Sequence, residues 1–266
     1  MTGKMFKTCA VGVAVVGVTA LATIDVNAAV TFRTVAMTGD PAPGTGPGVV
    51  YSDLSTTRAV INGSGQVVFR GLLTGTGVDG TNNAGIWSDG SGSLGLVARD
   101  GDAALGAEPG VQYIGLFASR INEAGRIAFK STLTGPGVDS TNDRGIWSEG
   151  SGSLSLVMRE GNAAPGTEPG VVYSSVNIPL FNGAGQTAFV SFLTGPGVDN
   201  TNDRGIWSGG SGSLGLVARE GAAAPGTGPG VVYINLNGPV FNGAGQTAFN
   251  SHLTGPSVDF TNDTGI

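Results

Sequence analysis

The chain has 266 residues, of which 48 are glycine, and its formal net charge is −6. The usual share of glycine is roughly 7 %, and this excess excludes a coiled coil or a helical bundle, because glycine destabilises helix interiors. Collagen is excluded because glycine does not recur at every third position, and a disordered polyelectrolyte is excluded because 40 % of the residues are hydrophobic and only 12 % are charged.

The first 28 residues have the layout of a secretory signal peptide. Lys4 and Lys7 precede an uncharged apolar stretch at residues 9–22, and the small residues around Ala28 form a cleavage site after that position. The apolar stretch is shorter than a membrane-spanning helix requires, and an uncleaved anchor is the alternative interpretation. We therefore expect an exported protein, secreted or at the cell surface, with no membrane span in the mature chain.

The residues that remain after cleavage limit the partners and the chemistry. Lys130 is the only lysine beyond residue 28, and an acidic, lysine-poor chain cannot neutralise the phosphates of a nucleic acid. The sole cysteine, Cys9, lies in the signal segment, so the mature chain has no disulfide and no thiol chemistry. His252 is the only histidine, which excludes a His-dependent triad and a His-rich metal site. We expect no binding of nucleic acid and no enzymatic activity.

The dominant pattern is an internal repeat with a period of 60 residues. The segment 62–69, which reads Asn-Gly-Ser-Gly-Gln-Val-Val-Phe, recurs at 122–129, 182–189 and 242–249. Such self-similarity is typical of solenoids, propellers and arrays. We assign residues 29–266 to one repeat domain, whose Asn-x-x-Gly motifs begin at residues 62, 122, 182 and 242.

Each repeat contains four strand-like segments, which are clearest in the third copy. They are residues 175–181, 186–193, 205–208 and 214–219, separated by Gly-rich turns at 182–185 and 209–213 and by a long loop at 194–204. Four antiparallel strands per repeat at this period are typical of a β-propeller blade. The predicted fold class is all-β, with β-propeller-like tandem repeats; a β-solenoid is the alternative.

The alternation of side chains predicts which faces of the strands are buried. In the second segment, Phe189 and Leu193 lie on the face predicted to be buried, and Ala188, Val190 and Phe192 lie on the outward face. The fourth segment is predicted to bury three side chains together, those of Leu214, Leu216 and Ala218.

The two ends of the sequence do not coincide with the ends of a repeat. Residues 32–37 align with the fourth strand of a repeat, and the chain stops at Ile266, where the third strand of another repeat begins. We therefore expect an incomplete fragment of a longer repeat protein, with the number of blades and the closure of a ring left open.

The motif Asn-x-x-Gly-x-x-Ala-Phe at residues 122–129, 182–189 and 242–249 resembles the NxxGxxAF tandem-repeat family of exported bacterial proteins, whose members can carry alternative C-terminal sorting anchors. The first copy departs from the motif, with Val68 in place of alanine. The repeats are also loosely similar to Tol-type β-propeller repeats, which place an Ala-Phe strand after a tight turn and then a Gly-Ile-aromatic strand. The resemblance implies export and surface attachment, and it implies no established activity.

In a propeller, the loops between the second and third strands and the connections between repeats emerge on one face. That face collects most of the acidic residues, whereas turns of Gly, Ser and Asn form the opposite face. The loop acids are Asp79, Asp139, Asp143, Asp199, Asp203, Asp259 and Asp263, and the connection acids are Asp100, Asp102, Glu108, Glu160, Glu168 and Glu220. We expect an unidentified protein or glycan to bind at this acidic loop face.

Paired loop aspartates are candidate calcium ligands, because Ca²⁺ prefers carboxylate oxygens. The pairs are Asp139 with Asp143, Asp199 with Asp203, and Asp259 with Asp263. Their spacing is one residue longer than in the usual Asp-x-Asp-x-Asp-Gly loop, and the first copy has Asn83 in place of the second aspartate. The favoured interpretation is a loop whose Asp and Asn side chains cap their own backbone.

Two further repeated features have a structural and a functional interpretation. Trp87, Trp147 and Trp207 occur once per repeat; exposed, they would stack on sugars, but their place in a short strand favours packing between repeats. The Arg-acid pairs at 99–100, 159–160 and 219–220 point in opposite directions in a strand, which predicts solvated strand ends rather than a catalytic pair.

Together these observations predict an exported, surface-associated β-repeat protein that acts as a structural or interaction module. The first alternative is a carbohydrate-binding propeller, with calcium as its one possible cofactor. The second alternative is a glycan-active enzyme that uses surface carboxylates as its acid–base pair.

Overall fold

The computed structural model describes residues 32–55 and 59–266, and Val35–Ile266 forms one compact unit. The predicted signal peptide, residues 1–28, lies outside the described residues. The described part is all-β, as predicted: strands, turns and loops account for it, and it contains no helix long and apolar enough to cross a membrane.

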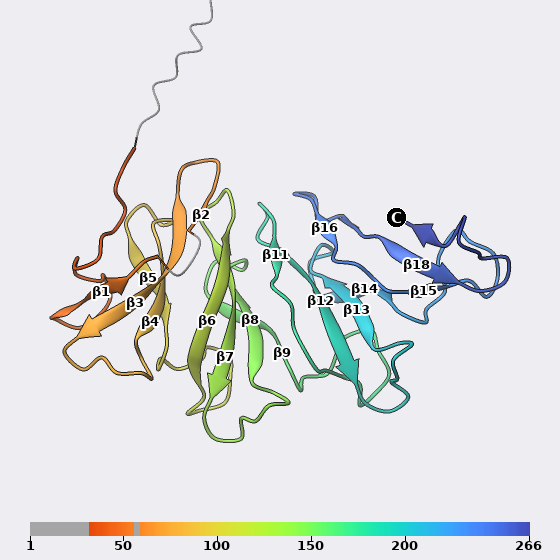
Figure 1. Ribbon diagram of the computed structural model, residues 1–266, viewed down its shortest axis with the longest axis horizontal. Helices are drawn as coiled ribbons and strands as arrows, with labels where there is room; N and C mark the ends of the chain where they lie inside the picture. Colours follow the sequence, from red (N-terminus) through yellow and green to blue (C-terminus); the bar gives the residue numbers. More distant parts are fainter. Residues whose placement is uncertain (1–31, 56–58) are drawn as a thin grey trace, which may run out of the picture. The chain divides into compact units, whose positions relative to one another are not determined.

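Each of the first three repeats forms one antiparallel sheet, and the sheets follow one another in chain order (Figure 1). In the first and third repeats, the first two strands both pair with the third. The first repeat contains β1 (Val49–Asp53), β2 (Val60–Ile61), β3 (Val67–Gly75), β4 (Ala84–Ser88) and β5 (Gly95–Arg99). The second contains β6 (Gln112–Ile121), β7 (Ile127–Thr134), β8 (Arg144–Ser148) and β9 (Ser155–Arg159). The third contains β10 (Val172–Tyr173), β11 (Leu180–Phe181), β12 (Thr187–Thr194), β13 (Arg204–Ser208) and β14 (Gly215–Arg219).

The fourth repeat continues the pattern in two smaller sheets. It contains β15 (Val232–Ile234), β16 (Val240–Phe241), β17 (Thr247–Ala248), β18 (Ser251–Thr254) and β19 (Thr264–Gly265), with β15 and β19 on either side of β18 and β16 beside β17. The prediction of propeller-like repeats with four antiparallel strands is therefore confirmed at the level of the single repeat.

The first strand of a repeat is continuous in one copy and interrupted in others. Residues 174–179 of the third repeat form no strand, so the predicted segment 175–181 is reduced to β11, and β10 precedes it. Pro179 has no N–H to donate to the ladder, and Pro239 occupies the same place between β15 and β16. The second repeat has Ser119 at this position, and its strand β6 is continuous.

The predicted strand at residues 32–37 is wrong. These residues form no strand, and no described strand pairs with them. An isolated extended segment lacks the interstrand hydrogen bonds that define a strand.

An aromatic triad forms the centre of each complete repeat. In the third repeat the ring of Trp207 lies edge-on to Tyr173 at 4.9 Å and stacks on Phe189 at 6.1 Å, measured between ring centroids. Trp207 is fully buried, and its indole N–H donates to the carbonyl oxygen of Pro165 at 3.0 Å, in the connection that precedes the repeat. Trp87 and Trp147 have the same environment, so the prediction that these tryptophans are packing residues is confirmed.

Successive sheets pack face to face, and we call each such contact a seam. At the seam between the second and third repeats, Ile146 and Met158 pack against the cluster that contains Phe189 and Trp207. At the next seam, Val190 packs with residues of the fourth repeat.

Both faces of a central strand are therefore buried, which corrects the prediction of an outward face. Ala188 and Val190 are as buried as Phe189, and only Phe192 on that side is exposed. The reason is that each sheet has a neighbour on both sides, so no face of an inner repeat meets solvent along its whole length.

A β-bulge in the fourth strand corrects the prediction that Leu214, Leu216 and Ala218 share one face. The register shifts between Ile206 and Trp207, so that Trp207 pairs with Leu216 whereas Ile206 pairs with Ala218. An extra residue in one strand reverses the facing of the side chains beyond it. Leu216 accordingly packs in the cluster of Trp207, and Ala218 packs in the cluster of Ile206.

The asparagine of the repeated motif forms a ladder across the seams. The side-chain amide of Asn62 donates to the carbonyl oxygen of Asn122 at 2.8 Å, that of Asn122 donates to Asn182 at 3.0 Å, and that of Asn182 donates to Asn242 at 2.8 Å. The side-chain oxygen of Asn122 also accepts hydrogen bonds from the backbone of Ala124 and Arg126. One side chain thus closes its own turn and ties it to the next repeat.

Candidate functional site

The loops between the second and third strands are closed by their own side chains. In the loop between β7 and β8, the Asp139 carboxylate accepts hydrogen bonds from the backbone N–H of Thr141 at 2.8 Å and from its hydroxyl at 2.6 Å. Asn142 accepts from the backbone of Asp139 and donates to the carbonyl oxygen of Gly137. The same bonds form at Asp79, Asp199 and Asp259. The bonds from Thr141 stabilise the charged form of Asp139 and lower the pKa of its carboxyl group.

The second aspartate of each pair faces away from this turn and joins the sheet. The carbonyl oxygen of Asp143 accepts a hydrogen bond from the backbone of Leu133, and Asp203 and Asp263 accept equivalent bonds. No group of three or more His, Cys, Asp or Glu side chains that could hold a metal ion occurs in the described part of the chain. The structure therefore supplies the contacts of the backbone-capping interpretation, and the calcium site stays a prediction.

In the second and third repeats, an arginine at the end of the fourth strand ties the loop to the connection between repeats. The Arg159 guanidinium donates to the carbonyl oxygen of Asn142 at 2.7 Å and forms an ion pair with Glu108. Arg219 makes the same pair of contacts, with Asn202 at 2.7 Å and with Glu168 at 2.7 Å. These bonds hold the loop face as one connected surface.

The acid that follows the arginine at the end of each fourth strand is buried, which corrects the prediction of solvated strand ends. Asp100, Glu160 and Glu220 are all buried, and so is Arg159. Asp100 accepts a hydrogen bond from the backbone N–H of Gly115 at 2.9 Å, and Glu220 accepts one from Leu236 at 3.1 Å. Asp100 and Glu220 thus reach across a seam to the backbone of the next repeat, a role that the adjacent Arg-acid sequence does not reveal.

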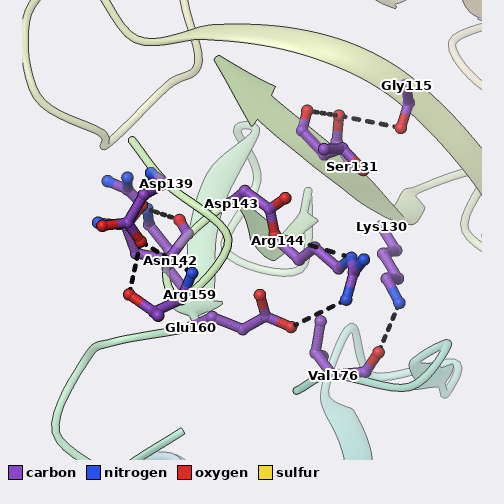
Figure 2. Close-up of polar contacts among 12 residues, drawn as sticks. Gly115, Lys130, Ser131, Asp139, Asn142, Asp143, Arg144, Arg159, Glu160 and Val176 are labelled. Atoms are coloured by element: carbon purple, nitrogen blue, oxygen red, sulfur yellow. Dashed lines mark hydrogen bonds and ion pairs between the residues drawn. The ribbon is translucent and has the colours of Figure 1, made fainter. Parts of the chain in front are cut away.

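Glu160 departs from this arrangement, as Figure 2 shows. Both of its carboxylate oxygens are buried, and within the described residues neither accepts a hydrogen bond. The nearest cation is the Arg144 guanidinium, at 3.8 Å. Lys130 makes the contact across this seam instead, and its ammonium donates to the carbonyl oxygen of Val176 at 2.6 Å.

The electrostatic environment of Glu160 follows from this geometry. Burial raises the pKa of its carboxyl group to about 7, and the neighbouring Asp143 carboxylate acts in the same direction. Arg144 and Lys130 oppose that shift because they attract the charged form. Burial in turn lowers the pKa of the Lys130 ammonium. Lys130 is therefore a half-buried residue that bonds to the next repeat.

The tip of each loop carries a residue that the sequence reasoning did not single out. The loop bonds fix the residues on both sides of one exposed position, which is occupied by Gly80, Ser140, Asn200 and Phe260 in the four copies. Phe260 is 89 % exposed. Aligning the four copies would have revealed this variable position, because its neighbours Asp and Thr are constant in all four.

Two open cavities lie at equivalent places at the turn end of the first two seams. Their volumes are about 360 and 350 Å³, and both are lined by the Gly-Ser turn before a fourth strand and by the Asn-x-x-Gly turn of the next repeat. In the first, Arg126 donates to Gly150 and Glu149 accepts from Ile127. Because Arg126 and Glu149 already hydrogen-bond to backbone atoms, the polar groups that remain for a ligand in these cavities are serine hydroxyls and main-chain atoms.

Comparison with known proteins identifies a family for nearly the whole chain. The model described as Family of unknown function (DUF7453) matches residues 16–266. None of the curated proteins matches the chain.

Proposed function

Since the chain belongs to DUF7453, a family of unknown function, we propose its role from its own residues: an exported β-repeat scaffold that displays variable loop tips to a partner. The partner class is a protein or a glycan outside the cell. Export is proposed from the charged, apolar and small-residue segments of residues 1–28.

The observation that carries the proposal is the contrast between a fixed loop frame and a variable tip. In every copy the loop frame is the same set of hydrogen bonds. In the second repeat, Thr141 donates to the Asp139 carboxylate, and Asn142 accepts from the Asp139 backbone and donates to a carbonyl oxygen of its own loop. The enclosed position holds glycine, serine, asparagine or phenylalanine, and it is exposed each time. Repeat proteins that bind partners use such an arrangement, with a constant scaffold beneath changeable surface residues.

An exposed aromatic ring at one tip supports the same proposal. Phe260 is 89 % exposed, and large aromatic side chains carry much of the binding energy where two proteins meet. Trp147 and Trp207, by contrast, are buried where two repeats pack together, and Trp87 is buried within the first repeat, so sugar stacking would have to use other residues. A glycan partner would therefore be bound by the loop tips, and calcium-dependent binding and glycan hydrolysis are the alternatives that the experiment distinguishes.

The experiment compares two sets of charge-altering substitutions on opposite ends of the same strands. Ser140→Arg, Asn200→Arg and Phe260→Arg change the loop tips, whereas arginines at Ser91, Ser151 and Ser211 change exposed positions in the turns. Labelled protein is applied to a glycan array and to intact cells of the organism that encodes it, with and without calcium.

We expect the loop-tip variant to lose binding and the turn variant to retain it, with equal melting temperatures for both. Binding that survives in the loop-tip variant refutes the proposal. Release of reducing ends from a bound glycan would support the enzyme alternative, and binding that vanishes on chelation would support the calcium-dependent one.

A further inference from the structure

The chain contains four Asn-Gly pairs, at 62–63, 182–183, 237–238 and 242–243. In such a pair, the glycine backbone nitrogen attacks the side-chain Cγ of asparagine. A C–N bond forms, the bond from Cγ to the amide nitrogen breaks, and ammonia leaves with the proton of the attacking N–H. Water then opens the cyclic imide to aspartate or isoaspartate. From the sequence alone, all four pairs are expected to deamidate equally readily, because glycine has no side chain to obstruct ring closure.

Two of the pairs are held in the seams. Asn182 is buried, its side-chain oxygen accepts from the backbone of Gln186, and its amide donates to Asn242 across the seam. Asn62 is also buried, and the N–H of Gly63, which would be the attacking group, donates to the Glu123 carboxylate at 2.9 Å. Both side chains must break several hydrogen bonds before Cγ can reach the glycine nitrogen.

The pair at 242–243 is intermediate. Asn242 is exposed, yet its side-chain oxygen accepts from the backbone of Ala244 at 3.0 Å and of Gln246 at 2.9 Å. The turn therefore still restrains the carboxamide, although solvent reaches it.

The pair at 237–238 lies between β15 and β16, outside any strand. Asn237 is exposed, and its backbone N–H donates to the carbonyl oxygen of Asn250 at 2.9 Å. Within the described residues its side-chain amide makes no hydrogen bond, in contrast to the three others. A side chain without such restraints is free to rotate toward the next backbone nitrogen.

We propose that Asn237 is the site of spontaneous deamidation in the folded protein, and that the seams protect Asn62 and Asn182. The neighbouring residue gives the modification a structural consequence. Leu236 is fully buried, and its N–H donates to Glu220 at the seam between the third and fourth repeats. Isoaspartate at position 237 inserts an extra main-chain carbon directly after this anchor, so the modified protein is expected to unfold at lower denaturant concentration.

The test is a time course of the whole chain in mildly alkaline buffer, both folded and unfolded in urea. Peptide mapping by mass spectrometry follows the replacement of NH₂ by OH at each asparagine, and an isoaspartate methyltransferase assay reports the rearranged product. In the folded chain we expect Asn237 to be modified at least roughly tenfold faster than Asn182, because Asn182 reacts only after local opening. In urea the two rates become comparable.

A substitution at the next residue separates ring closure from direct hydrolysis. Gly238→Val is the variant of choice, because a Cβ at Gly238 has no neighbour within 4 Å and its backbone does not adopt a positive φ. We expect this variant to keep its stability and its Asn237 unmodified. Equal rates at Asn237 and Asn182 in the folded chain overturn the proposal, as does an intact Asn237 in folded protein whose urea-unfolded form deamidates.

Discussion

Removal of the Asn122 side chain tests whether the asparagine ladder stabilises the stack of repeats. Asn122→Ala deletes three hydrogen bonds of 3.0 Å each, two from the backbone of Ala124 and Arg126 and one to the carbonyl oxygen of Asn182. The site is buried, so water does not replace them. At about 1 kcal/mol net per bond, we expect a loss of about 3 kcal/mol in the free energy of unfolding.

The fourth copy offers a matched control in the same chain. Asn242→Ala removes the equivalent turn bonds to Ala244 and Gln246, but the Asn242 side chain is exposed and makes no bond to another repeat within the described residues. Water can satisfy the freed groups there, so we expect a loss of only about 1 kcal/mol.

Unfolding in guanidinium chloride, followed by the fluorescence of the buried tryptophans, measures both losses. Asn122→Asp adds a further check, because it retains the acceptor for the turn and replaces only the donor to Asn182 with a buried carboxyl group. Its destabilisation should grow as the pH rises and that group ionises. Equal destabilisation by Asn122→Ala and Asn242→Ala would show that the seam bond contributes nothing.

Three further substitutions probe close approach, backbone strain and protonation. Gly150→Ala places a Cβ 1.8 Å from the carbonyl oxygen of Gly185, so we expect a large drop in melting temperature, whereas Gly183→Ala, with no atom within 4 Å of its new Cβ, should leave the melting temperature nearly unchanged. Ser257 has a φ of 64°, so Ser257→Gly should raise the free energy of unfolding by about 1 kcal/mol in a denaturant titration, and no gain would refute a strained backbone. The raised pKa of Glu160, about 7 against an ordinary 4.5, means that the folded state binds the proton more tightly, so its contribution to stability is lost as the pH rises through that window. Glu160→Gln should therefore gain roughly 2 kcal/mol relative to the wild type between about pH 5 and pH 8, and parallel stability curves for the two proteins would contradict this account.

The repeat period and strand pattern were predictable because the residues that build one repeat recur at fixed spacing. The motif starting at Asn122, the tryptophan at 147 and the turn at 149–154 all lie within one sheet of four neighbouring strands. Local chemistry is sufficient here: apolar alternation specifies strands, and Asn with Gly specifies the turns between them. The self-capping of the loop around Asp139 was predictable for the same reason, since its partners lie within three residues.

The contacts that sequence reasoning missed all connect different repeats or depend on a shift in register. Ala218 faces away from Leu216 because of a bulge, and periodicity alone does not reveal one. Glu160 was predicted to lie at a solvated strand end, yet it is buried, and Lys130 beside it is half-buried and bonds to the next repeat. Burial of this kind depends on what lies across the seam.

The sequence by itself therefore determined the repeat, its strands, its turns and its loop frames, because those bonds close within a few residues or within one sheet. The tertiary structure alone decided which side chains are hidden between repeats. It also decided that the motif asparagines hydrogen-bond from one repeat to the next. Of the four Asn-Gly pairs, it placed the one at Asn237 in an exposed position, where the side chain makes no hydrogen bond within the described residues. The physical reason is that seam contacts join residues of different repeats, sixty positions apart in the asparagine ladder, and only the stacking of sheets brings those residues together.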